Sequence, residues 1–210
     1  MPQNLTGRSN LKLLDFTADE VRYRQSLAAG FKVAKAAGTE CPRLTGKTIA
    51  LIFEKASTRT GSAFEVAADD QGARVSCIGP AGSHNGHRDT IKAAAPVLGR
   101  CYDVIEHRGF KQSDAEMLAV WSSVPVCNGL ADPFRPTQAL ADLLAMTEFT
   151  HKHLSDNRDT ELGEEIFAKY GIERMGVTDE VFESRASVVF DQAENRLHTI
   201  KAVFMATLEG

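Results

Sequence analysis

The sequence predicts an α/β protein in which a parallel four-stranded sheet is flanked by helices and a C-terminal helix packs back onto it. Short apolar runs alternate with longer amphipathic stretches through the first 150 residues, the pattern of a parallel sheet covered on both faces. The 210 residues are 43% apolar and 25% charged, as in soluble globular domains. Beyond residue 150 the alternation stops, and the last 60 or so residues have too few apolar runs to fold alone.

The first third of the chain carries the clearest local signals. Thr17 followed by Glu20 forms a capping-box pattern, which predicts a helix that begins here and runs to Gly38. The apolar run 47–53 predicts a buried strand. Ser57 is a suitable N-cap for a second helix, which is expected to end near residue 71.

The later elements continue the alternation. Pro96 is expected to interrupt the end of the third helix, and Ser113 with Glu116 is a second capping-box pattern. The last helix has its apolar residues mostly on one side and therefore needs a partner surface. In chain order, the expected elements after residue 71 are a strand at 74–78, a helix at 89–99, a strand at 102–106, a helix at 113–121, a strand at 124–127, and helices at 136–150 and 192–208.

The composition excludes several classes of function. The net charge of −4 argues against a sequence-independent nucleic-acid binder, which needs a basic face. No window approaches 18 apolar residues, so we expect no transmembrane helix and no membrane partner. The four cysteines form no C-x-x-C pair, and no cluster has metal-ligand spacing. We therefore expect free thiols in a cytoplasmic protein and no bound metal.

Groups suited to an anion follow the first predicted strand. Ser57, Thr58, Arg59 and Thr60 stand at a helix N-terminus, where free N–H groups and the helix dipole favour negative charge. Hydroxyls donate hydrogen bonds to phosphate oxygens, and an arginine adds charge-assisted bonds. The alternative interpretation is an ordinary serine cap beside a solvated arginine.

Cationic and amide side chains also follow the later strands. Arg108 stands at the end of the third strand, and Arg135 and Gln138 stand at the start of the helix after the fourth. Because ligands bind beyond the carboxyl ends of parallel strands, these residues and Arg59 are candidates for one crevice. The alternative is that each is a separate surface group.

Several long segments, in the same order along the chain, resemble the ornithine carbamoyltransferase family. The resemblance begins with Phe-Glu-Lys-Ala-Ser-Thr-Arg-Thr, which is similar to the family's carbamoyl-phosphate motif. Two further segments are similar to its other ligand segments, and two to its C-terminal signature. These are, in order, residues 53–60, 105–110, 136–138, 181–184 and 191–201, within a resemblance that covers about 3–150 and 157–208.

The resemblance implies a reaction that uses no cofactor. The carbamoyl group of carbamoyl phosphate is transferred to the δ-amine of ornithine, giving citrulline and phosphate, in arginine biosynthesis or catabolism. It implies that Ser57–Thr60 and Arg108 hold the phosphate, and that Thr60, Arg108 and Arg135 polarise the carbonyl oxygen as an oxyanion site. Gln138 resembles the acceptor for the carbamoyl amide.

The same resemblance bears on the remaining candidates and on assembly. Arg196 is similar to an arginine that lies beside the phosphate or bridges the domains in the family. The family is typically a homotrimer, and the loop that contains His84 and Arg88 resembles the segment lent to a neighbouring subunit's site.

The chain also departs from the family pattern. Gly61 replaces the last arginine of S-T-R-T-R, Arg135 stands where the family has histidine, and His84 stands where it has glutamine. The segments that bind ornithine in the family, an N-N pair, an S-M-G loop and an H-C-L-P loop, are missing. We therefore expect a carbamoyl-phosphate-binding domain at 1–150, a short remnant of the ornithine-binding domain at 151–190, and a helix at 191–210 that packs on the first domain.

Two hypotheses of function follow. In the first, the chain is an ornithine-type carbamoyltransferase that binds carbamoyl phosphate with impaired catalysis, since nothing identifiable recognises the α-amino and α-carboxylate groups of ornithine. In the second, it is a non-catalytic remnant, or a binding subunit that joins a trimer without turnover.

Overall fold

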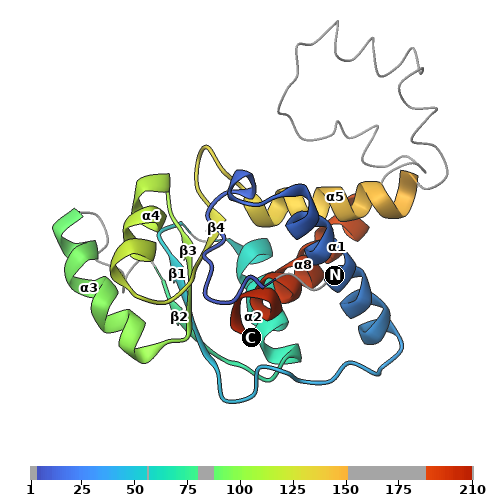
Figure 1. Ribbon diagram of the computed structural model, residues 1–210, viewed down its shortest axis with the longest axis horizontal. Helices are drawn as coiled ribbons and strands as arrows, with labels where there is room; N and C mark the ends of the chain where they lie inside the picture. Colours follow the sequence, from blue (N-terminus) through green and yellow to red (C-terminus); the bar gives the residue numbers. More distant parts are fainter. Residues whose placement is uncertain (1–3, 56, 80–87, 151–187, 210) are drawn as a thin grey trace, which may run out of the picture.

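A four-stranded parallel sheet forms the centre of the protein, as the alternating sequence pattern predicts (Figure 1). The computed structural model describes residues 4–55, 57–79, 88–150 and 188–209. The strand order is β2-β1-β3-β4, and every pairing is parallel. The strands are β1 (Thr48–Phe53), β2 (Arg74–Ile78), β3 (Val104–Arg108) and β4 (Val126–Leu130).

Helices cover both faces of this sheet (Figure 1). On one face, Ile52 and Ile105 pack with Ile91 and Leu118, which belong to the two helices on that side. The other face carries the larger core. The helices of the first face are α3 (Arg88–Cys101) and α4 (Gln112–Trp121), and those of the second are α1 (Ala18–Ala36), α2 (Thr58–Asp70), α5 (Pro136–Thr150) and α8 (Val189–Leu208), with a short 3-10 turn, η1 (Leu13–Asp15), before α1.

The local start and stop signals of α1 and α2 are confirmed. The Thr17 side chain accepts a hydrogen bond from the Glu20 backbone N–H, and the Glu20 carboxylate accepts one from the Thr17 N–H, which completes the capping box. Gly38 follows α1 with a φ of 66°, a conformation that favours glycine. Ser57 caps α2 by accepting from the Thr60 N–H at 3.3 Å.

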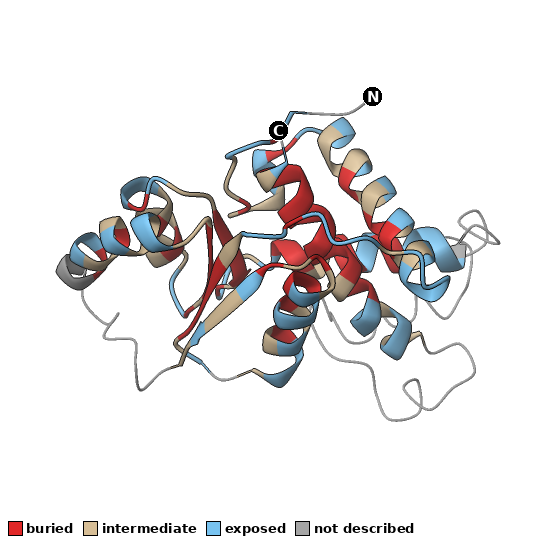
Figure 2. Ribbon diagram, turned by 90° about the horizontal axis from the view of Figure 1, so that it is seen from below, coloured by how far each residue is buried: buried red, intermediate tan, exposed pale blue. Residues whose placement is uncertain are grey.

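Helix α8 packs back onto the sheet domain and is buried on nearly all sides. Every residue from Asn195 to Thr207 except Leu197 is buried, and α8 lies against α1, α2 and α5. Phe204 meets Phe64 of α2 edge to face, with ring centroids 5.7 Å apart. In Figure 2 the buried residues, in red, run through the sheet and into the helices that cover it. The expectation that the C-terminal helix packs on the first domain is therefore confirmed.

One buried charge in α8 is matched by two carboxylates. The ammonium group of Lys201, fully buried, lies 2.6 Å from a carboxylate oxygen of Glu40 and 2.6 Å from one of Asp70. A buried cation without such partners would be strongly destabilising. These ion pairs therefore link α8 to the segment after α1 and to the end of α2.

Several boundaries differ from the sequence-based expectation. Strands β3 and β4 each begin two residues later than expected, and they continue past their expected ends because the polar residues His107 and Asn128 are buried in the sheet. Helix α3 continues past Pro96 to Cys101. Helix α4 has Lys111 at its N-cap, without a side-chain cap, so the capping box expected from Ser113 is not formed.

No helix in the described part of the chain is long and apolar enough to cross a membrane.

Candidate functional site

A cavity of about 770 Å³ opens at the carboxyl ends of the strands, where ligands bind in parallel sheets. Its walls come from the start of α2, the end of β3, the segment between β4 and α5, the first turns of α5, and α8. The lining residues are Ser57, Arg59, Thr60, Arg108, Leu130, Asp132, Pro133, Arg135, Gln138, Ala139, Asp142 and Arg196.

The start of α2 and the end of β3 are joined by hydrogen bonds. Thr60 is buried, and its hydroxyl oxygen accepts from the Ser57 hydroxyl at 3.1 Å and from a guanidinium nitrogen of Arg108. Phe53, the last residue of β1, pairs with Arg108 in the sheet register, which brings the two segments together. The helix N-terminus and the Arg108 cation thus face the same space.

Arg196 reaches the cavity from α8. It is buried, and its Nη2 donates to the carbonyl oxygen of Gly129 at 3.0 Å and to the hydroxyl of Thr137 at 3.5 Å. These bonds hold the guanidinium between the end of β4 and the start of α5. The last helix therefore contributes a cation to a site whose other parts lie before residue 143.

The opposite wall is formed by the start of α5. The Gln138 side-chain amide donates to a carboxylate oxygen of Asp142, one turn later, at 3.2 Å. This bond orients the amide and leaves its carbonyl oxygen as an acceptor. Arg135, just before α5, is exposed at the rim.

Positive charge dominates the cavity. Four arginines line it, against the carboxylates of Asp132 and Asp142. Burial and, to a smaller extent, the charge of the neighbouring Arg108 together lower the pKa of Arg196 to about 10. Burial also lowers the pKa of Arg108, and the charges of Arg59 and Arg135 add to that effect. Both guanidinium groups remain protonated at neutral pH, so the cavity is suited to a multiply charged anion.

The structure brings together most of the residues proposed from sequence. Of that set, Ser57, Arg59, Thr60, Arg108, Arg135, Gln138 and Arg196 line the cavity. Thr58 is exposed and is not among the lining residues. His84 lies outside the described residues. Arg88 begins α3, but its side chain is not described.

Sequence reasoning missed the acidic residues of the site. Asp142 stands four residues after Gln138 in α5, a spacing that places both on one helix face and that the sequence alone displays. Glu106 stands two residues before Arg108, on the same face of β3, and is fully buried. It lies inside the segment 105–110 that resembles the family, but a carboxylate in a buried strand carries no local signal of its role.

A second cavity, of about 280 Å³, adjoins the first between α2, α5 and α8. Arg59, Gln138 and Arg196 line both cavities. Apolar side chains such as Val66 and Leu197 make up much of the remaining wall. The positively charged cavity is therefore continuous with a partly apolar slot.

Comparison with known sequences identifies the family. The aspartate/ornithine carbamoyltransferase carbamoyl-P binding domain matches residues 8–148. The chain belongs to the aspartate/ornithine carbamoyltransferase family. The Asp/Orn binding domain of the same family matches residues 151–207. All of helix α8 except its last residue lies within that second match, yet the helix packs against the helices of the first.

Individual relatives agree with this assignment. The chain is 36% identical to an ornithine carbamoyltransferase of Staphylococcus aureus strain Newman, over 329 aligned positions that cover 98% of this chain and 99% of that protein. Because this chain has only 210 residues, more than a third of those positions are a gap in it. This member of the family is therefore shortened internally relative to that protein.

Solved structures show the same fold. The ornithine carbamoyltransferase from Pyrococcus furiosus superposes with a TM-score of 0.85 at 26% identity, covering 99% of each chain. The ornithine carbamoyltransferase from Thermus thermophilus superposes with a TM-score of 0.75 at 26% identity, covering 95% of this chain and 98% of that one. The α/β carbamoyltransferase fold is thus confirmed.

Proposed function

We propose that this protein binds carbamoyl phosphate in the 770 Å³ cavity, with impaired transfer of the carbamoyl group to ornithine. The observation that carries the proposal is the convergence of four arginines on the N-terminus of α2. A dianionic phosphate is favoured there by free backbone N–H groups, the helix dipole and charge-assisted hydrogen bonds together.

The geometry suggests a role for each group around the bound molecule. The phosphate lies against Ser57, Arg59 and Thr60, and Arg108 reaches it from β3. The carbonyl oxygen is polarised by donors from Thr60, Arg108 and Arg135, which act as a preorganised oxyanion site. Gln138, held by Asp142, accepts from the carbamoyl amide.

In the transfer step, an unprotonated amine attacks the carbonyl carbon, and the tetrahedral intermediate collapses with loss of phosphate. The groups described above act on the carbamoyl phosphate side of this step. The acceptor side belongs to the second domain of the family, and here its match is confined to residues 151–207. This shortening supports weak or absent recognition of ornithine.

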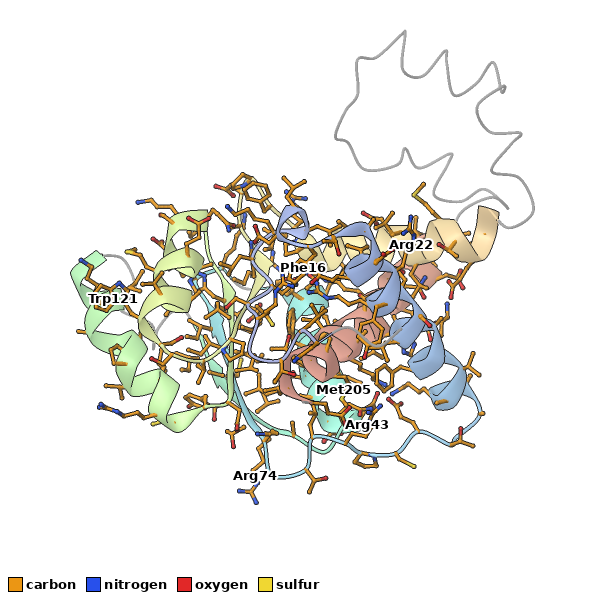
Figure 3. The ribbon with its side chains drawn as sticks, in the orientation of Figure 1. Phe16, Arg22, Arg43, Arg74, Trp121 and Met205 are labelled. Atoms are coloured by element: carbon orange, nitrogen blue, oxygen red, sulfur yellow. The ribbon has the colours of Figure 1, made fainter. Side chains whose placement is uncertain are left out.

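Calorimetric titration with carbamoyl phosphate and with inorganic phosphate tests the binding proposal. The Arg59→Ala substitution removes one charge-assisted contact, worth about 1.5–3 kcal/mol, so the affinity should fall about ten- to hundredfold. Arg74→Ala is the matched control. Arg74 is exposed at the start of β2, at the opposite end of the sheet, and points away from the molecule in Figure 3. Equal affinities in the two variants would refute the proposed site.

A second candidate is a non-catalytic binding subunit that joins a trimer, and the internal shortening favours it. Citrulline formation by the purified protein separates the two candidates when measured beside the binding titration. Binding with slow turnover supports the impaired enzyme. Binding without turnover, in a particle of trimeric mass by light scattering, supports the subunit.

A further inference from the structure

Glu106 is a buried acid directly beside the anion cavity, with no part in the transfer step described above. It lies on β3, two residues before Arg108, so both side chains point to the same face of the sheet. Its exposed fraction is 0%, and neither carboxylate oxygen has a hydrogen-bond partner among the described residues. A buried carboxyl group without a hydrogen-bond partner requires an explanation, because buried polar groups nearly always have one.

The sheet is shaped around this carboxyl group. The register between β3 and β4 shifts between His107 and Arg108, and Gly129 is the extra residue of β4 at that point. A Cβ atom on Gly129 would lie 1.7 Å from Oε1 of Glu106, so any other residue there would force the Glu106 carboxyl group to move. The carbonyl of the same Gly129 accepts the hydrogen bond of Arg196. Gly129 thus lies close to Glu106 and is bonded to a cation of the anion cavity.

The groups that face Glu106 come from several elements. Arg108 of β3 and Arg196 of α8 act on it as positive charges. In the sheet register, Glu106 pairs with the apolar Leu51 of β1 and with Cys127 of β4. Cys77 of β2 pairs in turn with Leu51. Burial raises the pKa of Cys127 to about 12 and also raises that of Cys77, so both thiols are uncharged at neutral pH. Arg24 of α1 is a further cation, which acts on Cys127.

Two opposing effects act on the Glu106 carboxyl group. Burial raises its pKa well above the usual range, because the charged form loses its hydration. The charges of Arg196 and Arg108 oppose this effect and favour the carboxylate. An anion bound to the same two arginines would offset their charge, which leaves burial to favour the protonated acid.

We propose that Glu106 is the proton-linked counter-charge of the anion site: it is ionised to a larger extent when the site is empty, and it takes up a solvent proton when a dianion binds. This inference rests on the proposed anion-binding function of the cavity. The carboxylate neutralises part of the arginine charge in the empty site. Its protonation on binding avoids a repulsive negative charge beneath the ligand.

The sign of the pH dependence follows from this scheme. Glu106 has a higher pKa in the bound state than in the free state, so binding consumes a proton at any pH between the two values. Affinity for a dianion therefore rises as the pH falls through that window, by up to about tenfold for each pH unit. Replacing Glu106 with glutamine removes this dependence.

The test uses inorganic sulfate, which stays dianionic across about pH 6 to 9, whereas phosphate titrates within that range. Calorimetry in two buffers of different ionisation enthalpy measures the protons taken up on binding. The proteins compared are the wild type, Glu106→Gln and Glu54→Gln. Glu54 is a suitable control because it is a second carboxylate near the sheet and therefore the alternative source of proton uptake. It lies just beyond the neighbouring strand β1, with a carboxylate oxygen 3.6 Å from Nε2 of His107.

We expect proton uptake by the wild type and by Glu54→Gln, and none by Glu106→Gln. Sulfate binding without proton uptake by the wild type, at every pH tested, overturns the inference whether or not the variants fold. Uptake that persists in Glu106→Gln, or that is lost in Glu54→Gln, also overturns it. If sulfate and phosphate both fail to bind the wild type, the proposed anion site itself is wrong.

Discussion

The burial of α8 leads to a sharp prediction about stability. Phe204 lies in the middle of this helix with an exposed fraction of 0% and meets Phe64 edge to face. Replacing it with alanine removes a whole ring from a packed core and leaves a cavity. Phe149 of α5 provides a matched control, because its ring is 44% exposed in another helix.

The size of the effect follows from the burial of each ring. A fully buried phenylalanine costs about 3–5 kcal/mol when replaced by alanine. Domains of this kind have a net stability of about 5–15 kcal/mol, so Phe204→Ala should remove a large part of it. At about 2–4 °C per kcal/mol for a chain of this length, the melting temperature should fall by roughly 6–20 °C. Phe149→Ala should cost much less, because nearly half of that ring already faces solvent.

Urea unfolding followed by far-ultraviolet circular dichroism measures both variants. All proteins are compared at one concentration, because any oligomerisation makes the apparent stability depend on concentration. An equal loss of unfolding free energy in Phe204→Ala and Phe149→Ala would refute the reasoning. It would show that α8 is not a core element of the sheet domain.

Three further predictions concern the site and its supports. Arg135→His should strengthen carbamoyl phosphate binding in calorimetry, since the family has histidine at this place, and weaker binding would show that the arginine is an adaptation of this chain. Gly99→Ala should lower the free energy of unfolding by about 1–3 kcal/mol, because the new Cβ would lie 1.6 Å from the Ser122 carbonyl oxygen. Gly30→Ala is the control, since Gly30 in α1 has open space around it, and it should raise that free energy by about 0.5–1 kcal/mol. Similar urea midpoints for the two variants would contradict this packing. Glu106→Gln should stabilise the protein more near about pH 8 than near about pH 5 in urea unfolding. The wild type loses stability as the pH rises above the unfolded pKa of Glu106, because the pKa of this carboxyl group is raised in the folded protein. A difference between the two proteins that does not change with pH would contradict the raised pKa.

Local signals in the sequence predicted the elements where a few adjacent residues decide the outcome. The Thr17 and Glu20 capping box involves groups three residues apart, and the structure forms it as expected. Strand β2 was predicted with its observed bounds, Arg74–Ile78. The bounds of strand β4 were not predicted, since the side-chain amide of Asn128 is satisfied by partners outside the strand, among them the distant carbonyl oxygen of Leu11.

The sequence by itself determined the order of strands and helices, the family, and seven of the residues that line the cavity, because these depend on apolar periodicity, capping groups and recognisable motifs. Only the tertiary structure decided which of those residues share a site. The Arg196 guanidinium reaches it because α8 is buried against α1, α2 and α5. Glu106 lies beneath it because a register shift places Gly129 opposite its carboxyl group. Both depend on contacts between segments distant in the chain, and no local pattern encodes such contacts.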